Sequence, residues 1–149
     1  MERWFANTKR RHMAKVVLGM FFLPLVAATA AEVSTQVYAV PAGSHPHDVA
    51  PDPAPGGPVW YTAQHQGALG RLDPETGKTT HIPLGEGSAP HGVIVGPDGA
   101  PWITDGGLNA IVRVDPQTHA VKRYPLPGER GNANLNTATF DGKGKLWFT

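Results

Sequence analysis

Short runs of β-branched and other apolar residues follow one another through most of the chain, each bounded by Gly, Pro, Asp or Asn. In the clearest stretch these runs are residues 91–95, 101–104, 110–114 and 120–126. The segments between them are turn sequences, in which Pro presets φ, Gly accepts a positive φ and Asp or Thr bonds nearby backbone. Outside the N-terminus, no stretch of helical length has a 3.6-residue apolar period. The pattern therefore predicts an all-β protein built from short strands.

The same pattern recurs at a spacing of 42 residues. Two segments match at this spacing, and a third copy begins at Asn136 and reaches Trp147-Phe148-Thr149. Four short strands in about 42 residues are typical of one blade of a β-propeller. The matching pairs are Trp60 and Trp102, Thr62 and Thr104, Arg71 and Arg113, Asp73 and Asp115, Pro74 and Pro116, and Thr76 and Thr118.

The repeat divides residues 31–149 into blades at about 43–84, 85–126 and an incomplete 127–149. Because a propeller closes with about 4–8 blades, the chain is predicted to be the N-terminal part of a larger propeller. Residues 36–40 align with the outermost strand of a blade and are predicted to complete the last blade of the ring. The three repeated tryptophans are predicted to fill the layers between blades. Arg71 and Arg113 lie two residues before Asp73 and Asp115, and they are predicted to have a structural pairing or a partly exposed strand position rather than a catalytic role.

The first 30 residues differ from the rest and predict an export signal. Five basic residues come first, an apolar run follows from residue 16 to 26, and Ala28-Thr29-Ala30 supplies a small-x-small cleavage site. The apolar run is shorter than the roughly 20 residues of a membrane-spanning helix. Arg10-Arg11 also fits a twin-arginine signal loosely, although a start at Met13 would remove this pair. We expect a periplasmic or secreted protein that meets the membrane only through this signal.

Charge and composition exclude some functions. Residues 31–149 carry eight basic and eleven acidic residues, a net charge of −3, so they offer no basic patch for nucleic acid. The chain has no cysteine, which excludes disulfides and thiolate metal sites. His45-Pro46-His47 suggests a metal, but no matched third and fourth ligands accompany it, and we predict no metal site.

Several phrases resemble the virginiamycin B lyase (streptogramin B lyase) family. They are residues 90–93 (PHGV), 102–105 (WITD), 70–77 (GRLDPETG) and 147–149 (WFT). The resemblance covers residues 37–149, about a third of a seven-bladed member. It implies a lyase that opens a cyclic depsipeptide antibiotic at its ester by elimination, with Mg²⁺ as cofactor. The family's catalytic residues lie chiefly on later blades, so catalytic residues remain unknown here.

Propeller topology predicts where a ligand would bind. Loops that enter the innermost strands share one face with the loops between second and third strands, and this face holds the channel mouth. His47, His91 and Asn136 are the candidate substrate-binding residues, for a small molecule or cyclic peptide. The neighbouring polar residues on this face are Ser44, His45, Gln64, His65, Gln66, Glu86, Ser88, Asp105, Asn109, Arg130, Asn132 and Asn134.

Two other functions remain open besides the lyase. One is a hydrolase propeller of the gluconolactonase kind, which would need a Ca²⁺ site of carboxylates and Asn at the channel. The other is a periplasmic binding or scaffolding propeller without catalysis, because a fold alone implies no chemistry.

Overall fold

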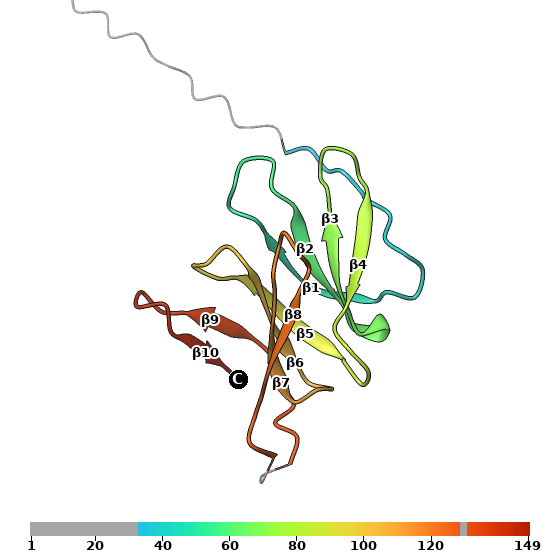
Figure 1. Cartoon of the computed structure of the whole chain (residues 1–149). Coiled ribbons are helices and arrows are strands. Elements are labelled where there is room, and N and C mark those ends of the chain that lie inside the picture. Colours follow the sequence, from blue (N-terminus) through green and yellow to red (C-terminus); the bar gives the residue numbers. More distant parts are fainter. Residues whose placement is uncertain (1–32, 129–130) are drawn as a thin grey trace, which may run out of the picture. The chain divides into compact units, whose positions relative to one another are not determined.

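A computed structural model describes residues 33–128 and 131–149 (Figure 1). Two four-stranded antiparallel sheets form its main part, each with its strands in chain order. The first sheet consists of β1 (Pro46–Pro51), β2 (Val59–Ala63), β3 (Ala68–Leu72) and β4 (Thr79–Pro83). The second consists of β5 (Pro90–Val95), β6 (Pro101–Asp105), β7 (Ala110–Val114) and β8 (Val121–Pro125). We call these sheets blade 1 and blade 2.

A third, two-stranded sheet follows the two blades. It pairs β9 (Ala138–Phe140) with β10 (Leu146–Phe148), and we call it sheet 3. A 3₁₀ turn, η1 (Gln64–Gln66), joins β2 to β3. No helix in residues 33–128 and 131–149 is long and apolar enough to cross a membrane. The predicted signal, residues 1–30, lies outside the described residues.

The strands of blade 2 lie within one residue of the predicted runs, because the turn residues act as expected. The Asp115 carboxylate accepts hydrogen bonds from the backbone N–H groups of Gln117 (3.1 Å) and Thr118 (2.8 Å). The Asp73 carboxylate does the same for Glu75 (2.9 Å) and Thr76 (3.1 Å). The repeated Asp-Pro-x-Thr phrase is therefore the turn between the third and fourth strands of each blade.

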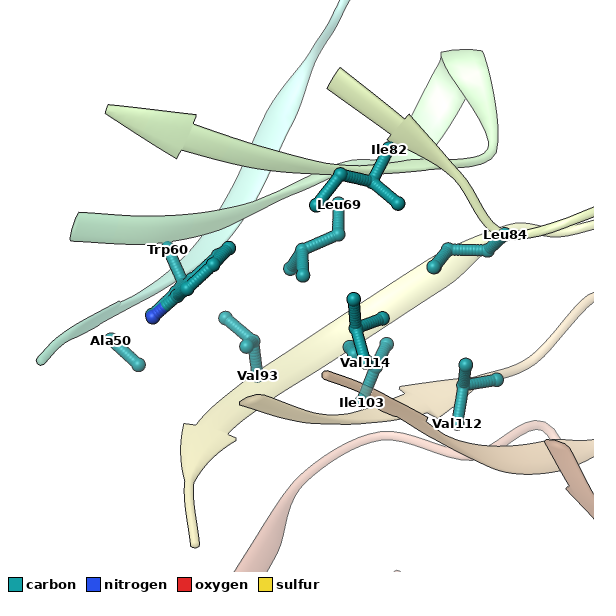
Figure 2. Packing of buried hydrophobic residues seen from close by; sticks show 9 residues of the cluster. All are labelled: Ala50, Trp60, Leu69, Ile82, Leu84, Val93, Ile103, Val112 and Val114. Atoms are coloured by element: carbon teal, nitrogen blue, oxygen red, sulfur yellow. The ribbon is translucent and has the colours of Figure 1, made fainter. Parts of the chain in front are cut away.

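The hydrophobic core lies between the two blades (Figure 2). Trp60 is completely buried there and contributes the largest side chain. Ala50, Trp60, Leu69, Ile82 and Leu84 from blade 1 and its following loop face Val93, Ile103, Val112 and Val114 of blade 2. Burial of this apolar area contributes about 25 cal/mol per Å². Blade 1 and blade 2 therefore stabilise each other, as repeat units do.

The three repeated tryptophans differ in burial. Trp60 fills the layer between blades, which confirms that prediction. Trp102 is partly exposed, stacks on Tyr124 with ring centroids 5.6 Å apart, and meets the edge of Phe140 in sheet 3 at 5.7 Å. Trp147 is 56% exposed. Within the described residues, Trp147 has no following blade to pack against, so it does not fill an inter-blade layer here.

Arg71 and Arg113 are both partly exposed on their strands, as predicted, and Arg113 also forms a structural ion pair. The Arg113 Nε donates to the Asp98 carboxylate at 2.7 Å, whereas the Arg113–Asp115 distance is 4.0 Å. Asp98 also accepts the Trp102 indole N–H at 3.0 Å. Asp98 lies in the β5–β6 turn, next to the cross-strand pair of Trp102 and Arg113, so it reaches both side chains. Burial opposes ionisation of Asp98, but the hydrogen bonds from Trp102, Arg113 and the Ala100 N–H, together with the charge of Arg113, outweigh burial and lower the Asp98 pKa.

Blade 1 lacks this aspartate. Its β1–β2 turn, residues 52–58, is two residues longer than the β5–β6 turn, residues 96–100. The Asp52 carboxylate accepts the Ala54 N–H (2.9 Å) within the turn itself. The buried indole N–H of Trp60 is left without a hydrogen-bond partner.

Residues 36–40 are not paired as a strand in this structure, and their place in the last blade of the ring stays a prediction. No strand forms there, because no neighbouring strand among the described residues pairs with this segment. Its side chains instead cover the outer face of blade 1, where the Tyr38 hydroxyl donates to the Pro74 carbonyl at 2.8 Å. An open apolar hollow of about 390 Å³ remains on this face, lined by Tyr38, Val40, Val49, Val59, Tyr61 and Leu72 among others.

Candidate functional site

The strand registers place His47, His91 and Asn136 at equivalent positions of their repeats. The middle residue of each Trp-x-Thr phrase pairs with a residue of the strand before it: Tyr61 with Val49, Ile103 with Val93, and Phe148 with Ala138. Each candidate residue lies two positions before this partner in its own repeat. The spacing from His47 to His91 is 44 residues rather than 42, because the β1–β2 turn of blade 1 is longer. The equivalence of His47 and His91 is therefore as predicted.

The structure brings His47 and His91 together across the boundary between the blades. Their ring centroids are 3.8 Å apart, with the planes tilted by 45°. His47 is exposed, whereas His91 is half-buried and its Nδ1 has no hydrogen-bond partner. The pair therefore presents one exposed imidazole backed by a second.

A second histidine pair forms beside the first one. His45 and His65 stack with centroids 3.8 Å apart and planes at 21°. His45 has a positive φ of 45°, and the His65 backbone N–H donates to the Ser44 carbonyl at 3.4 Å. The Gln66 side chain donates to the Ala42 carbonyl at 3.0 Å. The loop before β1 is thus held against η1, an arrangement that depends on loop geometry and that no spacing in the sequence indicated.

A repeated threonine links each repeat to the next. Thr62 Oγ1 accepts the Asp48 N–H at 3.0 Å and donates to the His91 carbonyl at 2.8 Å. Thr104 Oγ1 accepts the Gly92 N–H at 2.9 Å and donates to the Asn136 carbonyl. We call this arrangement the threonine relay. Its signal in the sequence is the Thr at the end of Trp-x-Thr, although sequence reasoning did not assign it this role.

The relay fixes the main chain of the candidate residues and leaves their side chains free. The Asn136 backbone is held further, because its N–H donates to the Thr149 carbonyl at 2.7 Å. Asn136 is exposed to solvent. Asn136 is therefore placed in the same ring of positions as the two histidines, although only the histidines are shown in side-chain contact.

Other polar residues predicted on this face hold loops together. Asp105 is buried and accepts hydrogen bonds from the Ala89 and Leu108 N–H groups, both at 2.9 Å, and from the Ser88 hydroxyl. The Asn109 side chain accepts the Ala133 N–H at 2.8 Å. Their hydrogen-bonding capacity is used within the protein, so these residues brace the loops. Arg130 lies outside the described residues.

The described residues do not fit the Mg²⁺ ion that the family resemblance implies. Residues 33–128 and 131–149 contain no group of three or more His, Asp or Glu side chains arranged to hold a metal ion. Each of the two histidine pairs brings two imidazole rings into contact, and within the part of the chain that the structure describes neither pair has a third His, Asp or Glu side chain arranged with it to hold a metal ion. No step of the chemistry is therefore assigned to a metal on this part of the chain.

Antiparallel four-stranded sheets that repeat along the chain and pack face to face define a β-propeller. A family model described as the virginiamycin B lyase family matches residues 24–149. The chain belongs to this family. No curated protein sequence matches the chain at a significant level.

Solved structures agree with this assignment. A catalytically inactive variant of virginiamycin B lyase from Staphylococcus aureus, with quinupristin, is 27% identical with a TM-score of 0.67, covering 75% of this chain and 37% of that one. A streptogramin B lyase is 29% identical with a TM-score of 0.67, covering 75% and 36%. A gluconolactonase from Xanthomonas campestris, 19% identical with a TM-score of 0.55, covers 70% and 34% and shows only the fold. The chain thus spans slightly more than a third of the lyase structures.

Proposed function

We propose that this chain is part of a β-propeller lyase that opens ester-containing cyclic peptides of the streptogramin type by elimination. The observation that carries the proposal is the match to the virginiamycin B lyase family over residues 24–149. The paired histidines at equivalent repeat positions support it, because they bring two imidazole groups together on the face where the channel mouth is predicted. In this proposal His47, His91 and Asn136 form one wall of the binding site.

The elimination needs a base that removes a proton from the carbon next to a carbonyl. As that proton leaves, a carbon–carbon double bond forms and the neighbouring carbon–oxygen bond of the ester breaks. The ester oxygen departs with the electron pair as a carboxylate, and the ring opens without addition of water. Mg²⁺, where bound in the whole protein, would stabilise the negative charge that develops on the carbonyl oxygen.

The part assigned to this chain is binding and orientation of the cyclic peptide. An imidazole provides an aromatic face together with one hydrogen-bond donor and one acceptor in its neutral form. Asn136 adds an amide that can bond to peptide groups. Because the relay holds the backbone of these residues before the ligand arrives, little ordering cost remains to be met on binding.

The whole protein that contains these residues is the material for the test. Quinupristin is incubated with this protein and Mg²⁺, and the molecular mass of the purified product is measured by mass spectrometry. Elimination gives a ring-opened product with the mass of the substrate, whereas hydrolysis adds one water. A binding propeller would hold quinupristin without any product. A product heavier by one water, or no product at all, would overturn the lyase proposal.

The binding wall is tested separately by substitution. His47→Ala with His91→Ala should weaken quinupristin binding about tenfold, the loss expected for removing hydrogen-bond and stacking partners from one wall. His119→Asn is the matched control, because His119 lies in the exposed β7–β8 turn away from the pair. Equal affinity in the double variant and the wild type would contradict the assignment of His47 and His91.

We also propose that the chain is exported. The basic residues, the apolar run and Ala28-Thr29-Ala30 support cleavage near Ala30. N-terminal sequencing of the protein recovered from outside the cytoplasm should begin close to Ala31. A cytoplasmic product with its N-terminus intact would contradict export.

A further inference from the structure

Side-chain hydrogen bonds within the protein join the two strands that carry His47 and His91, and these bonds need no ligand. The hydroxyl of Thr62 bonds to the N–H of Asp48, the residue after His47, at 3.0 Å. The same hydroxyl donates to the carbonyl of His91 at 2.8 Å. One side chain of blade 1 therefore sets where both histidine backbones lie.

The Asp48 carboxylate makes a second tie across the same boundary. Its Oδ1 accepts the Val49 N–H on β1 at 3.0 Å, and its Oδ2 accepts the Val93 N–H on β5 at 3.1 Å. Hydrogen bonds to an ionised carboxylate are roughly twice as strong as those between neutral groups. The carboxylate thus joins the innermost strands of blades 1 and 2 directly beside the histidine pair.

The equivalent positions in the next two repeats cannot make this second tie. They are Gly92, which has no side chain, and Thr137, which has no carboxylate. A Cβ at Gly92 would lie 2.6 Å from the Asn136 carbonyl oxygen and 2.8 Å from Thr104 Oγ1, so even alanine does not fit there. Among the described repeats, only the boundary with a histidine on both sides has the aspartate.

We propose that Asp48 and Thr62 are positioning residues that hold the His47–His91 pair in its binding geometry. The Thr62 hydroxyl holds the backbones of the two histidine-bearing strands in register, and the Asp48 carboxylate holds the two strands at a fixed separation. Together they maintain the 3.8 Å ring contact. The importance of this geometry for the ligand rests on the proposed function, but the geometry itself can be measured without a ligand.

The experiment uses the whole protein with ¹⁵N-labelled histidine side chains. Asp48→Asn puts an amide NH₂ against one of two backbone N–H donors, which removes one acceptor and keeps the shape. Thr62→Val removes the hydroxyl, and Thr62→Ser restores it. Asp52→Asn is the matched control for the aspartate, because Asp52 caps only its own exposed turn. Thr118→Val is the control for the threonine, because the Thr118 hydroxyl lies in the exposed β7–β8 turn and accepts the Ala120 N–H there.

Three quantities are measured for each variant: the ring NMR signals of His47 and His91, the Kd for quinupristin, and the unfolding temperature. Asp48→Asn and Thr62→Val should shift or broaden both ring signals and raise the Kd about tenfold. Thr62→Ser should restore both, and Asp52→Asn should leave them unchanged. Thr118→Val should leave both ring signals and the Kd unchanged.

The outcomes separate this inference from the proposed function. Unchanged ring signals in Asp48→Asn and Thr62→Val would overturn the positioning role. A role confined to stability would also overturn it, shown by a lower unfolding temperature with the same signals and Kd as the wild type. If the ring signals move but neither the wild type nor any variant binds quinupristin, the positioning of the pair stands and the proposed substrate is wrong.

Discussion

Replacing each of the three repeated tryptophans by alanine should destabilise residues 31–149 in the order Trp60, Trp102, Trp147. The substitution is the same at each equivalent position, so the differences measure how each side chain is packed. Trp60 is completely buried between blades, Trp102 is partly exposed between Tyr124 and Phe140, and Trp147 is 56% exposed.

The magnitudes follow from burial. A buried aromatic side chain removes about 150–250 Å² from water, which at about 25 cal/mol per Å² corresponds to about 4–6 kcal/mol as an upper bound. Trp60→Ala should therefore cost about 4 kcal/mol, in line with the usual 3–5 kcal/mol for such substitutions. Trp102→Ala should cost about 2 kcal/mol, and Trp147→Ala about 1 kcal/mol or less, because less area is lost.

The assay is urea unfolding of the chain followed by far-UV circular dichroism, which does not depend on tryptophan fluorescence. Because small domains are stable by only about 5–15 kcal/mol, Trp60→Ala leaves little folded protein, and Trp60→Phe serves as the milder variant. It keeps most of the bulk and removes the unpaired indole N–H, so its cost should be about 1 kcal/mol. Equal costs at the three positions, or the largest cost at Trp147, would refute the inter-blade packing described above.

Three further predictions concern turns and close contacts. The pKa of Asp98 is lowered in the folded state, so the ionised carboxylate stabilises the protein above the ordinary aspartate pKa of 3.8. This stabilisation is lost as the pH falls through the pKa of the folded state. Asp98→Asn should therefore make the free energy of unfolding depend less on pH in this acid range. Gly70→Ala should cost about 2 kcal/mol or more in urea unfolding, because its Cβ would lie 2.0 Å from the Tyr61 ring. Replacing residues 52–58 by Gly-Pro-Asp-Gly-Ala should stabilise the chain by about 1 kcal/mol, because the new aspartate can accept the Trp60 N–H.

Each of these predictions has a matched control. Gly142→Ala should be nearly neutral, since nothing lies within 4 Å of a Cβ there. The exchanged turn with alanine in place of aspartate should give no gain, and an equal gain would attribute the effect to loop length. Arg113→Gln should reduce the acid dependence in the same sense as Asp98→Asn, because it removes one of the donors that lower the Asp98 pKa. Unchanged acid dependence in both variants would contradict the role given to Asp98.

Strands and turns could be predicted from the sequence because their causes are local. An Asp before Pro caps the following N–H groups wherever it occurs, and Asp73 and Asp115 both do so. The equivalence of His47 and His91 was also predictable, because a repeat transfers position from one copy to the next. The burial of Trp60 between the blades was predictable on the same ground, because a large apolar side chain at a repeated position is buried by the neighbouring repeat.

Features that depend on partners from other segments could not be predicted. Arg113 pairs with Asp98 from the neighbouring turn, which the two-residue spacing to Asp115 did not indicate. Residues 36–40 have the pattern of a strand, but a strand also needs a hydrogen-bonding neighbour. The stacking of His45 on His65 depends on the shape of two loops. Each of these outcomes is decided by geometry between segments rather than by the residues of one segment.

The threonine relay separates what holds the repeats together from what faces a ligand. Thr62 and Thr104 bond to main-chain groups, which every residue possesses. His91 and Asn136 can therefore occupy equivalent positions although one carries an imidazole and the other an amide. A change of side chain at such a position alters the chemistry of the wall at little cost to folding. Repeats joined through their backbones can in this way diversify their ligands one position at a time, while the scaffold stays constant.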